Sequence, residues 1–162
     1  MALDKNCKDT PYLLGRLTAI ISKSIDITAS QYSKAMSTPL SVLPYLIDEY
    51  HRKGDTVRPE EFADIMSELP SIPAGLTVVQ QGQWIIGYDH ELADIYREEN
   101  RRKMAKAIKL KRAELDMTQA QLAEKAGITK QTVGSIERGD SNVSLDVISS
   151  VMAVLGIRLD IG

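Results

Sequence analysis

The chain has 162 residues, of which 43% are hydrophobic and 26% are charged, and this balance is typical of a folded globular protein. The length allows one ordinary domain or two small ones. No segment approaches the roughly 18 consecutive apolar residues that a membrane-spanning helix needs. The N-terminal residues lack the apolar region of a secretory signal, and the chain has a single cysteine. These features predict a cytoplasmic protein with no membrane partner.

The net charge differs in sign between the two parts of the chain. Residues 1–100 contain 9 Lys and Arg against 15 Asp and Glu, whereas residues 101–162 contain 11 against 7. The overall charge of −2 does not favour a polyanionic partner, but the positive segment does. We therefore expect two domains, 1–100 and 101–162, of which the second is the candidate for binding nucleic acid.

Nearly every segment of the acidic part is predicted to be helical. Apolar residues recur with helical spacing over residues 11–29. A second helix is expected over residues 39–52, with Pro44 as an alternative start. A third covers about residues 58–69, before two prolines that end it.

A fourth helix is expected to begin near Thr77. It meets no breaker before Gly127, so it either continues into the basic part or is interrupted by a short charged linker at 98–103. The apolar stripe thins there, which favours a break.

Two glycines and two aromatic residues in this helix point to close packing. A helical glycine costs about 1 kcal/mol relative to alanine, so Gly82 and Gly87 predict a neighbouring helix that approaches closely. Trp84 and Tyr88 are then expected to belong to the core rather than to an interface.

The basic part is expected to contain four short helices and one strand. The helices are predicted at residues 103–115, 118–125, 129–137 and 144–155, and the alternating run at residues 156–161 predicts the strand.

The most informative segment is MTQAQLAEKAGITKQTVGSIERG, residues 117–139. Ala123 is small enough for a second helix to cross closely, and Gly127 lies where the turn needs a left-handed backbone. Val133 and Ile136 supply the apolar anchor of the helix that follows. The pattern as a whole predicts two short helices joined by a tight turn.

These residues resemble the lambda/434 repressor–Cro type of helix-turn-helix, the XRE family, over about residues 104–156. In that family an arginine on the first helix pairs with a glutamate that ends the recognition helix, and Arg112 and Glu137 match this pair. The resemblance implies DNA binding with the recognition helix in the major groove. The expected fold class is therefore mainly α: an N-terminal helical bundle, then a lambda-repressor-like helix-turn-helix domain with a short C-terminal strand.

The expected DNA contacts gather at the start of the recognition helix. Gln131 can pair with adenine through two hydrogen bonds, and Lys130 can reach the acceptors of guanine. Gln119 lies at a helix N-terminus, where a phosphate is favoured. The full expected set is Gln119, Thr129, Lys130, Gln131, Thr132, Ser135, Arg138 and Asn142.

The basic run before this module allows two interpretations. Lys106, Lys109 and Lys111 can add electrostatic attraction to DNA. A solvated helix face explains the run from Arg101 to Arg112 equally well.

The C-terminal segment SNVSLDVISSVMAVLGIRLDI resembles the tail of DNA-binding antitoxins and related small repressors, in which a final strand pairs across a dimer. A single short strand leaves unpaired edges, and pairing with a second copy satisfies them. The segment thus predicts a two-fold homodimer on an inverted repeat. Packing of the strand on the chain's own N-terminal domain is the alternative.

Two segments of the acidic part resemble the C-terminal helical region of the large subunit of type I-C CRISPR interference complexes. These are PYLLGR, residues 11–16, and IPAGLTVVQQGQWIIGYDHE, residues 72–91, and the resemblance spans about residues 10–96. In that family this region also serves as the small subunit, which lines the backbone of the complex and the displaced strand. Asp89, Glu91 and the negative net charge depart from the pattern, so a packing role is expected rather than strand binding.

No catalytic set is evident, and neither an enzymatic activity nor a cofactor is expected. His51 and His90 lie in no cluster with metal-ligand spacing. The sequence thus predicts a dimeric repressor or autoregulator that reads double-stranded DNA, with residues 10–96 binding a protein linked to CRISPR components. The alternatives are an antitoxin of a toxin–antitoxin pair and an interaction subunit of a CRISPR-type nucleoprotein complex.

Overall fold

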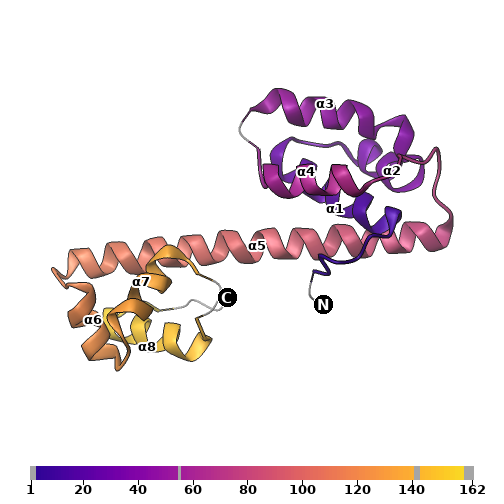
Figure 1. Cartoon of the computed structure of the whole chain (residues 1–162). Helices are drawn as coiled ribbons and strands as arrows, with labels where there is room; N and C mark the ends of the chain where they lie inside the picture. Colours follow the sequence, from indigo (N-terminus) through magenta and orange to yellow (C-terminus); the bar gives the residue numbers. More distant parts are fainter. Residues whose placement is uncertain (1–2, 55, 141–142, 159–162) are drawn as a thin grey trace. The chain divides into compact units, whose positions relative to one another are not determined.

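The computed structural model describes residues 3–54, 56–140 and 143–158, and within these ranges the protein is helical with no strand (Figure 1). The chain divides into two compact units, residues 1–95 and 96–162. None of the described helices is both long and apolar enough to cross a membrane.

The first unit is built on the apolar helix α1. Leu13, Leu17 and Ile20 of this helix are fully buried. The elements of the unit are α1 (Thr10–Ser24), α2 (Ala29–Ser37), the short 3-10 helix η1 (Pro39–Ser41), α3 (Leu43–Lys53), α4 (Pro59–Glu68) and the first part of α5 (Val78–Glu114).

The predicted helix over residues 11–29 is in fact two elements. Helix α1 ends at Ser24, and α2 begins after Thr28. The Thr28 hydroxyl accepts a hydrogen bond from the Gln31 backbone, while the Gln31 side chain accepts one from the Thr28 N–H. This reciprocal capping box is a strong start for a helix. Its Thr-x-x-Gln pattern is visible in the sequence and was the missed signal.

Pro44, not Pro39, marks the start of α3. Pro39 opens η1, whereas Pro44 occupies the first turn of α3, where its missing N–H costs nothing. Gly54 ends α3 with a φ of 78°, a conformation that glycine adopts without strain.

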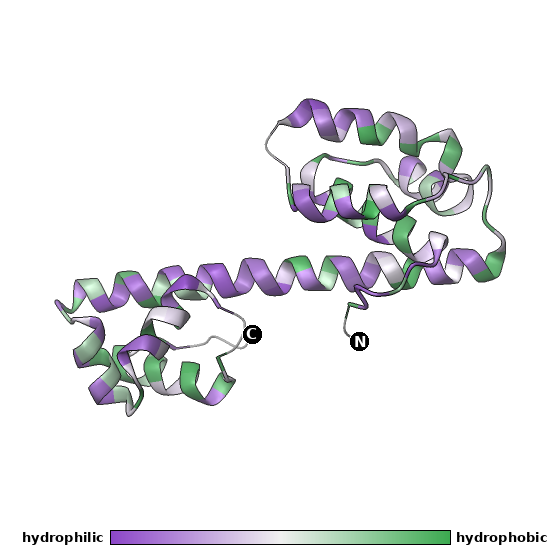
Figure 2. Cartoon of the chain, in the orientation of Figure 1, coloured by the Kyte–Doolittle hydropathy of each residue, from purple (hydrophilic) through white to green (hydrophobic). Residues whose placement is uncertain are grey.

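The predicted break at residues 98–103 is wrong, because α5 is one helix from Val78 to Glu114. This stretch is hydrophilic (Figure 2) but consists mostly of Glu, Arg and Lys, which are good helix formers. The thinning of the apolar stripe therefore marks a solvated part of a helix and not its end.

Helices α1 and α5 cross at a pair of glycines. A Cβ atom on Gly15 would overlap the carbonyl oxygen of Trp84, and one on Gly87 would overlap that of Tyr12. Gly87 thus marks the close approach that was predicted. Gly82 does not, because no atom lies within 4 Å of the position of its missing Cβ.

Trp84 and Tyr88 of α5 belong to the core of the first unit. Trp84 is fully buried and stacks on Tyr88 at a centroid distance of 5.3 Å. The Tyr88 hydroxyl lies 3.2 Å from that of Ser22 on α1.

The second unit contains the end of α5 and three short helices, α6 (Gln119–Ala126), α7 (Lys130–Arg138) and α8 (Leu145–Leu155). These helices enclose a separate core, whose buried members are Ile108, Leu122, Ala123, Val133, Ile136, Val151, Met152 and Leu155.

The predicted strand over residues 156–161 is not found in the described residues. Gly156 instead caps α8 with a φ of 68°, and residues 157 and 158 belong to no regular element. Residues 159–162 lie outside the described residues. A lone strand needs a partner edge for its backbone, and the described chain has no other strand to supply one.

Candidate nucleic-acid interface

Local capping interactions define the two helices of the motif. The Thr118 hydroxyl accepts a hydrogen bond from the backbone of Gln121 and starts α6. Gly127 has a φ of 68° and makes the turn. The Thr129 hydroxyl then accepts a hydrogen bond from the Thr132 backbone and starts α7. One orphan backbone donor in the first turn of each helix is thus satisfied by its N-cap side chain.

A buried ion pair fixes α7 against α5. The Arg112 guanidinium donates to both carboxylate oxygens of Glu137, over 2.6 Å and 3.1 Å, and donates to the Met117 carbonyl over 2.6 Å. Only 4% of the Glu137 side chain is exposed. Because its geometry is bidentate, the pair sets both the position and the rotation of α7.

The electrostatics of Glu137 follow from these contacts. Burial by itself raises the pKa of Glu137, but hydrogen bonds from Arg112 and Gln119 and the charges of Arg112 and Lys109 outweigh it, so the pKa lies below its usual range. The same hydrogen bond raises the pKa of Arg112. Glu137 therefore stays ionised near neutral pH and acts as a fixed anchor rather than as a proton carrier.

Two of the expected base-reading side chains project from the first turn of α7. Lys130 and Gln131 are exposed, and neither side chain is hydrogen-bonded to another residue in the described part of the chain. Thr129 and Thr132 lie beside them, with their hydroxyls 2.8 Å apart. The exposed turn thus offers one cation and one amide to a ligand.

The expected phosphate-contacting residues have different surroundings. Arg138 is 63% exposed; it donates to Ser135 over 3.1 Å and to Asp140 over 2.9 Å. The Gln119 amide donates to Glu137 over 2.9 Å, so this side chain helps to hold α7. A phosphate contact at Gln119 would therefore come from its backbone. Asn142 lies outside the described residues.

A groove of about 650 Å³ runs along this face of the unit. Ser144, the N-cap of α8, also lines the groove and was not predicted from the sequence. The first turn of α7 and the start of α8 therefore share one concave surface. The lining residues are Thr129, Gln131, Thr132, Ser135, Asp140, Val143, Ser144 and Val147.

The first unit contains a second cluster of charges, but it is internal. Glu91 is fully buried and accepts hydrogen bonds from Arg16 over 2.9 Å and from Arg58 over 2.5 Å. Arg16 also contacts Glu61, and Arg58 donates to Asp94 over 2.9 Å. The acid at position 91 is therefore a core ion-pair partner that joins α1 to α5.

The sequence of this chain matches two family models. Residues 1–96 match the family described as CRISPR-associated protein (Cas_Csd1). The chain belongs to this Cas_Csd1 family. Residues 108–161 match the helix-turn-helix family HTH_3. No curated protein matches the sequence.

Both resemblances predicted from the sequence are confirmed by these matches. The chain thus joins a Cas_Csd1 segment to a helix-turn-helix domain of the kind found in DNA-binding regulators. Residues 11–16 and 72–91, which carry this resemblance in the sequence, include the crossing glycines of α1 and α5. There the Tyr12 hydroxyl lies 3.1 Å from His90 Nδ1, and Arg16 pairs with Glu91.

Proposed function

We propose that this protein is a dimeric transcriptional regulator, a repressor or autoregulator, that reads an inverted-repeat operator through α7. The exposed Lys130 and Gln131 carry this proposal, because they project from a helix whose rotation is fixed by Arg112 and Glu137. A recognition helix docks with its N-terminal residues at base edges, and these are the residues at that end of α7.

The first unit is proposed to bind a protein linked to CRISPR components. It belongs to a CRISPR-associated family, and residues 1–100 carry a net negative charge that repels nucleic acid. The charged residues Arg16 and Glu91 are buried in its own core. A partner protein would therefore bind other residues, on the exposed surface of this unit.

Selection of duplexes by the full-length protein tests the DNA-reading role. The selected sites should be inverted repeats, bound about 10³-fold or more tightly than a scrambled duplex. Sedimentation should show two chains per site. Equal affinity for selected and scrambled duplexes would contradict the proposal, and one chain per site would contradict the dimer.

A second candidate function is an interaction subunit of a CRISPR-type nucleoprotein complex, and the match over residues 1–96 favours it. In that case the protein should co-purify with type I-C components and bind duplexes without sequence preference. A clean negative pull-down with those components, combined with a strong preference for one operator, would exclude this candidate.

A further inference from the structure

Three arginines line a hollow beside the C-terminal end of α7, the proposed recognition helix. The hollow has a volume of about 260 Å³. Its lining residues are Glu98, Arg101, Arg102, Arg138 and Gly139. Arg101 and Arg102 come from α5, whereas Arg138 is the last residue of α7. Residues that are distant in the sequence therefore place three guanidinium groups and one carboxylate around one space.

The backbone at Gly139 brings these elements together. Gly139 caps α7 with a φ of 79°, and its missing Cβ would lie 3.8 Å from the Arg101 carbonyl and from the Ala105 side chain. The end of the recognition helix thus lies directly against α5. Arg101 and Arg138 are held near each other by this packing and not by a flexible loop.

The arginines that line the hollow outnumber the carboxylates of Glu98 and Asp140, so it keeps a net positive charge. Arg138 pairs with Asp140, but no ion pair links Arg101 or Arg102 to another residue in the described ranges. Lys106 and Lys109 are exposed and follow Arg102 at the i+4 and i+7 positions, so they extend its face of α5. A guanidinium presents several fixed donors that match the oxygens of a phosphate.

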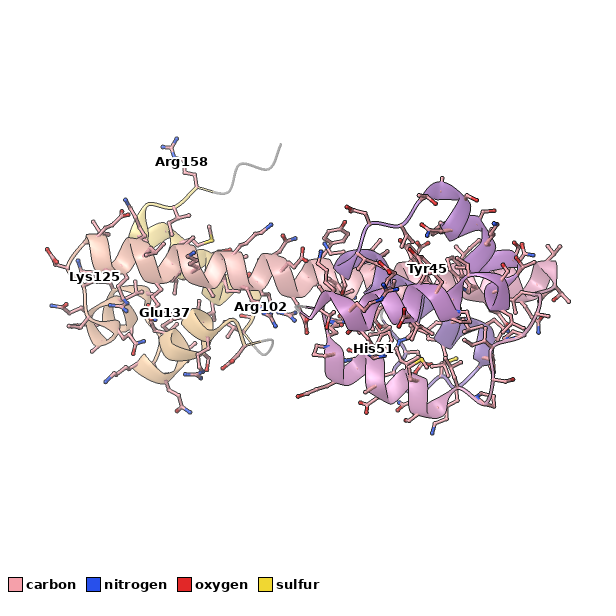
Figure 3. The ribbon with its side chains drawn as sticks, turned by 90° about the horizontal axis from the view of Figure 1, so that it is seen from above. Tyr45, His51, Arg102, Lys125, Glu137 and Arg158 are labelled. Atoms are coloured by element: carbon pink, nitrogen blue, oxygen red, sulfur yellow. The ribbon has the colours of Figure 1, made fainter. Side chains whose placement is uncertain are left out.

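We propose that Arg101, Arg102 and Arg138 bind a phosphate of the DNA backbone, on the face of α5 that adjoins the recognition helix. The site rests on the proposed DNA-reading function and adds a contact that carries no base specificity. It assigns the basic run of α5 a role beyond solvation, and Arg102 is exposed on that helix (Figure 3).

The salt dependence of DNA binding tests this site. Affinities of the full-length protein and of R101Q/R102Q are measured across a salt series, for a selected duplex and for a scrambled one. Each lost phosphate contact lowers the slope of log K against log salt by about 0.9, so the double variant should lose up to about 0.9 if this one contact is removed. The preference for the selected duplex should stay unchanged, because the phosphate is common to both.

Two control variants separate this site from general effects. K125Q removes one exposed charge near the end of α6, away from Arg102 (Figure 3). This variant should leave the slope unchanged. R101K/R102K keeps both charges on the same helix and should recover most of the slope. An unchanged slope in R101Q/R102Q, with wild-type helicity, would overturn the phosphate site.

The outcomes for the two proposals are distinguishable. A lower slope in R101Q/R102Q, with equal affinity of the wild type for selected and scrambled duplexes, would support the phosphate site and contradict the operator-reading function. A strong preference of the wild type for the selected duplex, with an unchanged slope in R101Q/R102Q, would support operator reading and contradict the phosphate site. Absence of binding to every duplex would overturn both, and tighter binding of single-stranded DNA or RNA would overturn the assignment to duplex DNA.

Discussion

Glu137 receives hydrogen bonds from two elements and thereby connects the whole motif. Arg112 reaches it from α5, and Gln119 reaches it from the first turn of α6. A buried carboxylate is stable only where such donors satisfy it. The rotation of α7, which decides which side chains face a ligand, therefore depends on this one anion.

Glu137→Gln should lower the stability of the second unit by about 1–3 kcal/mol at pH 7, because a charged hydrogen-bond acceptor is lost. The folded pKa of Glu137 lies below the ordinary value of 4.5, so its contribution is present above that pH and is lost as the pH falls through the folded pKa. The stability difference between wild type and variant should shrink below about pH 4.5. Urea unfolding at several pH values measures this; a difference independent of pH would contradict it.

Gln131→Ala should relax the sequence preference at one base pair, at a cost of about 1–3 kcal/mol there, and leave binding to scrambled DNA unchanged. The amide is exposed on the first turn of α7, where it can pair with adenine. Competition binding against single-base variants of the selected site measures the effect. Gln83→Ala in the first unit is the matched control. Unchanged discrimination would show that another side chain reads that base.

At the level of elements, substitutions of two glycines in α5 distinguish the effect of helix propensity from the effect of packing against α1. Gly82→Ala should stabilise the first unit by about 0.5–1 kcal/mol, because alanine favours helix and the space beside Gly82 is open. Gly87→Ala should destabilise it by several times that amount, because the new Cβ overlaps the Tyr12 carbonyl and forces α1 away. Thermal unfolding of the two variants compares them directly, and similar shifts in Tm would show that the crossing is looser than described.

The same pair shows what the sequence could predict and what it could not. Gly82 and Gly87 look alike in the sequence, and only the position of α1 distinguishes them. The caps at Thr28 and Thr118 are local patterns, so both could be found without a structure. A strand at the C-terminus could not be judged from local alternation, because a strand requires a partner edge.

The candidate site also contains residues that the sequence could predict and contacts that it could not. Its first turn, Lys130 and Gln131, lies within a contiguous pattern, so the sequence was sufficient to propose it. The contact of Gln119 with Glu137 and the hollow at Arg101 depend on how α5, α6 and α7 pack, which spacing does not reveal. Because a break in α5 was expected at residues 98–103, its basic residues were not predicted to lie on the surface of one regular helix.

At the level of the whole molecule, the two units have separate cores. The first is held by apolar residues such as Leu17 and Trp84 and by the buried pairing of Arg16 with Glu91. The second is smaller and is centred on residues such as Leu122 and Val133. Each unit can therefore lose its structure without removing buried apolar contacts from the other core.

Unfolding in urea should consequently proceed in two transitions. Leu17→Ala should lower the free energy of unfolding of the first unit by about 2–5 kcal/mol, and Leu122→Ala should do the same for the second. Trp84 is the only tryptophan and is buried in the first unit, so its fluorescence follows that unit alone, whereas far-ultraviolet circular dichroism follows both. Leu17→Ala should shift the fluorescence midpoint, and Leu122→Ala should shift only a transition seen by circular dichroism. If both variants moved both signals together, the units would unfold as one cooperative body, and the first unit would be needed to keep the DNA-reading helices folded.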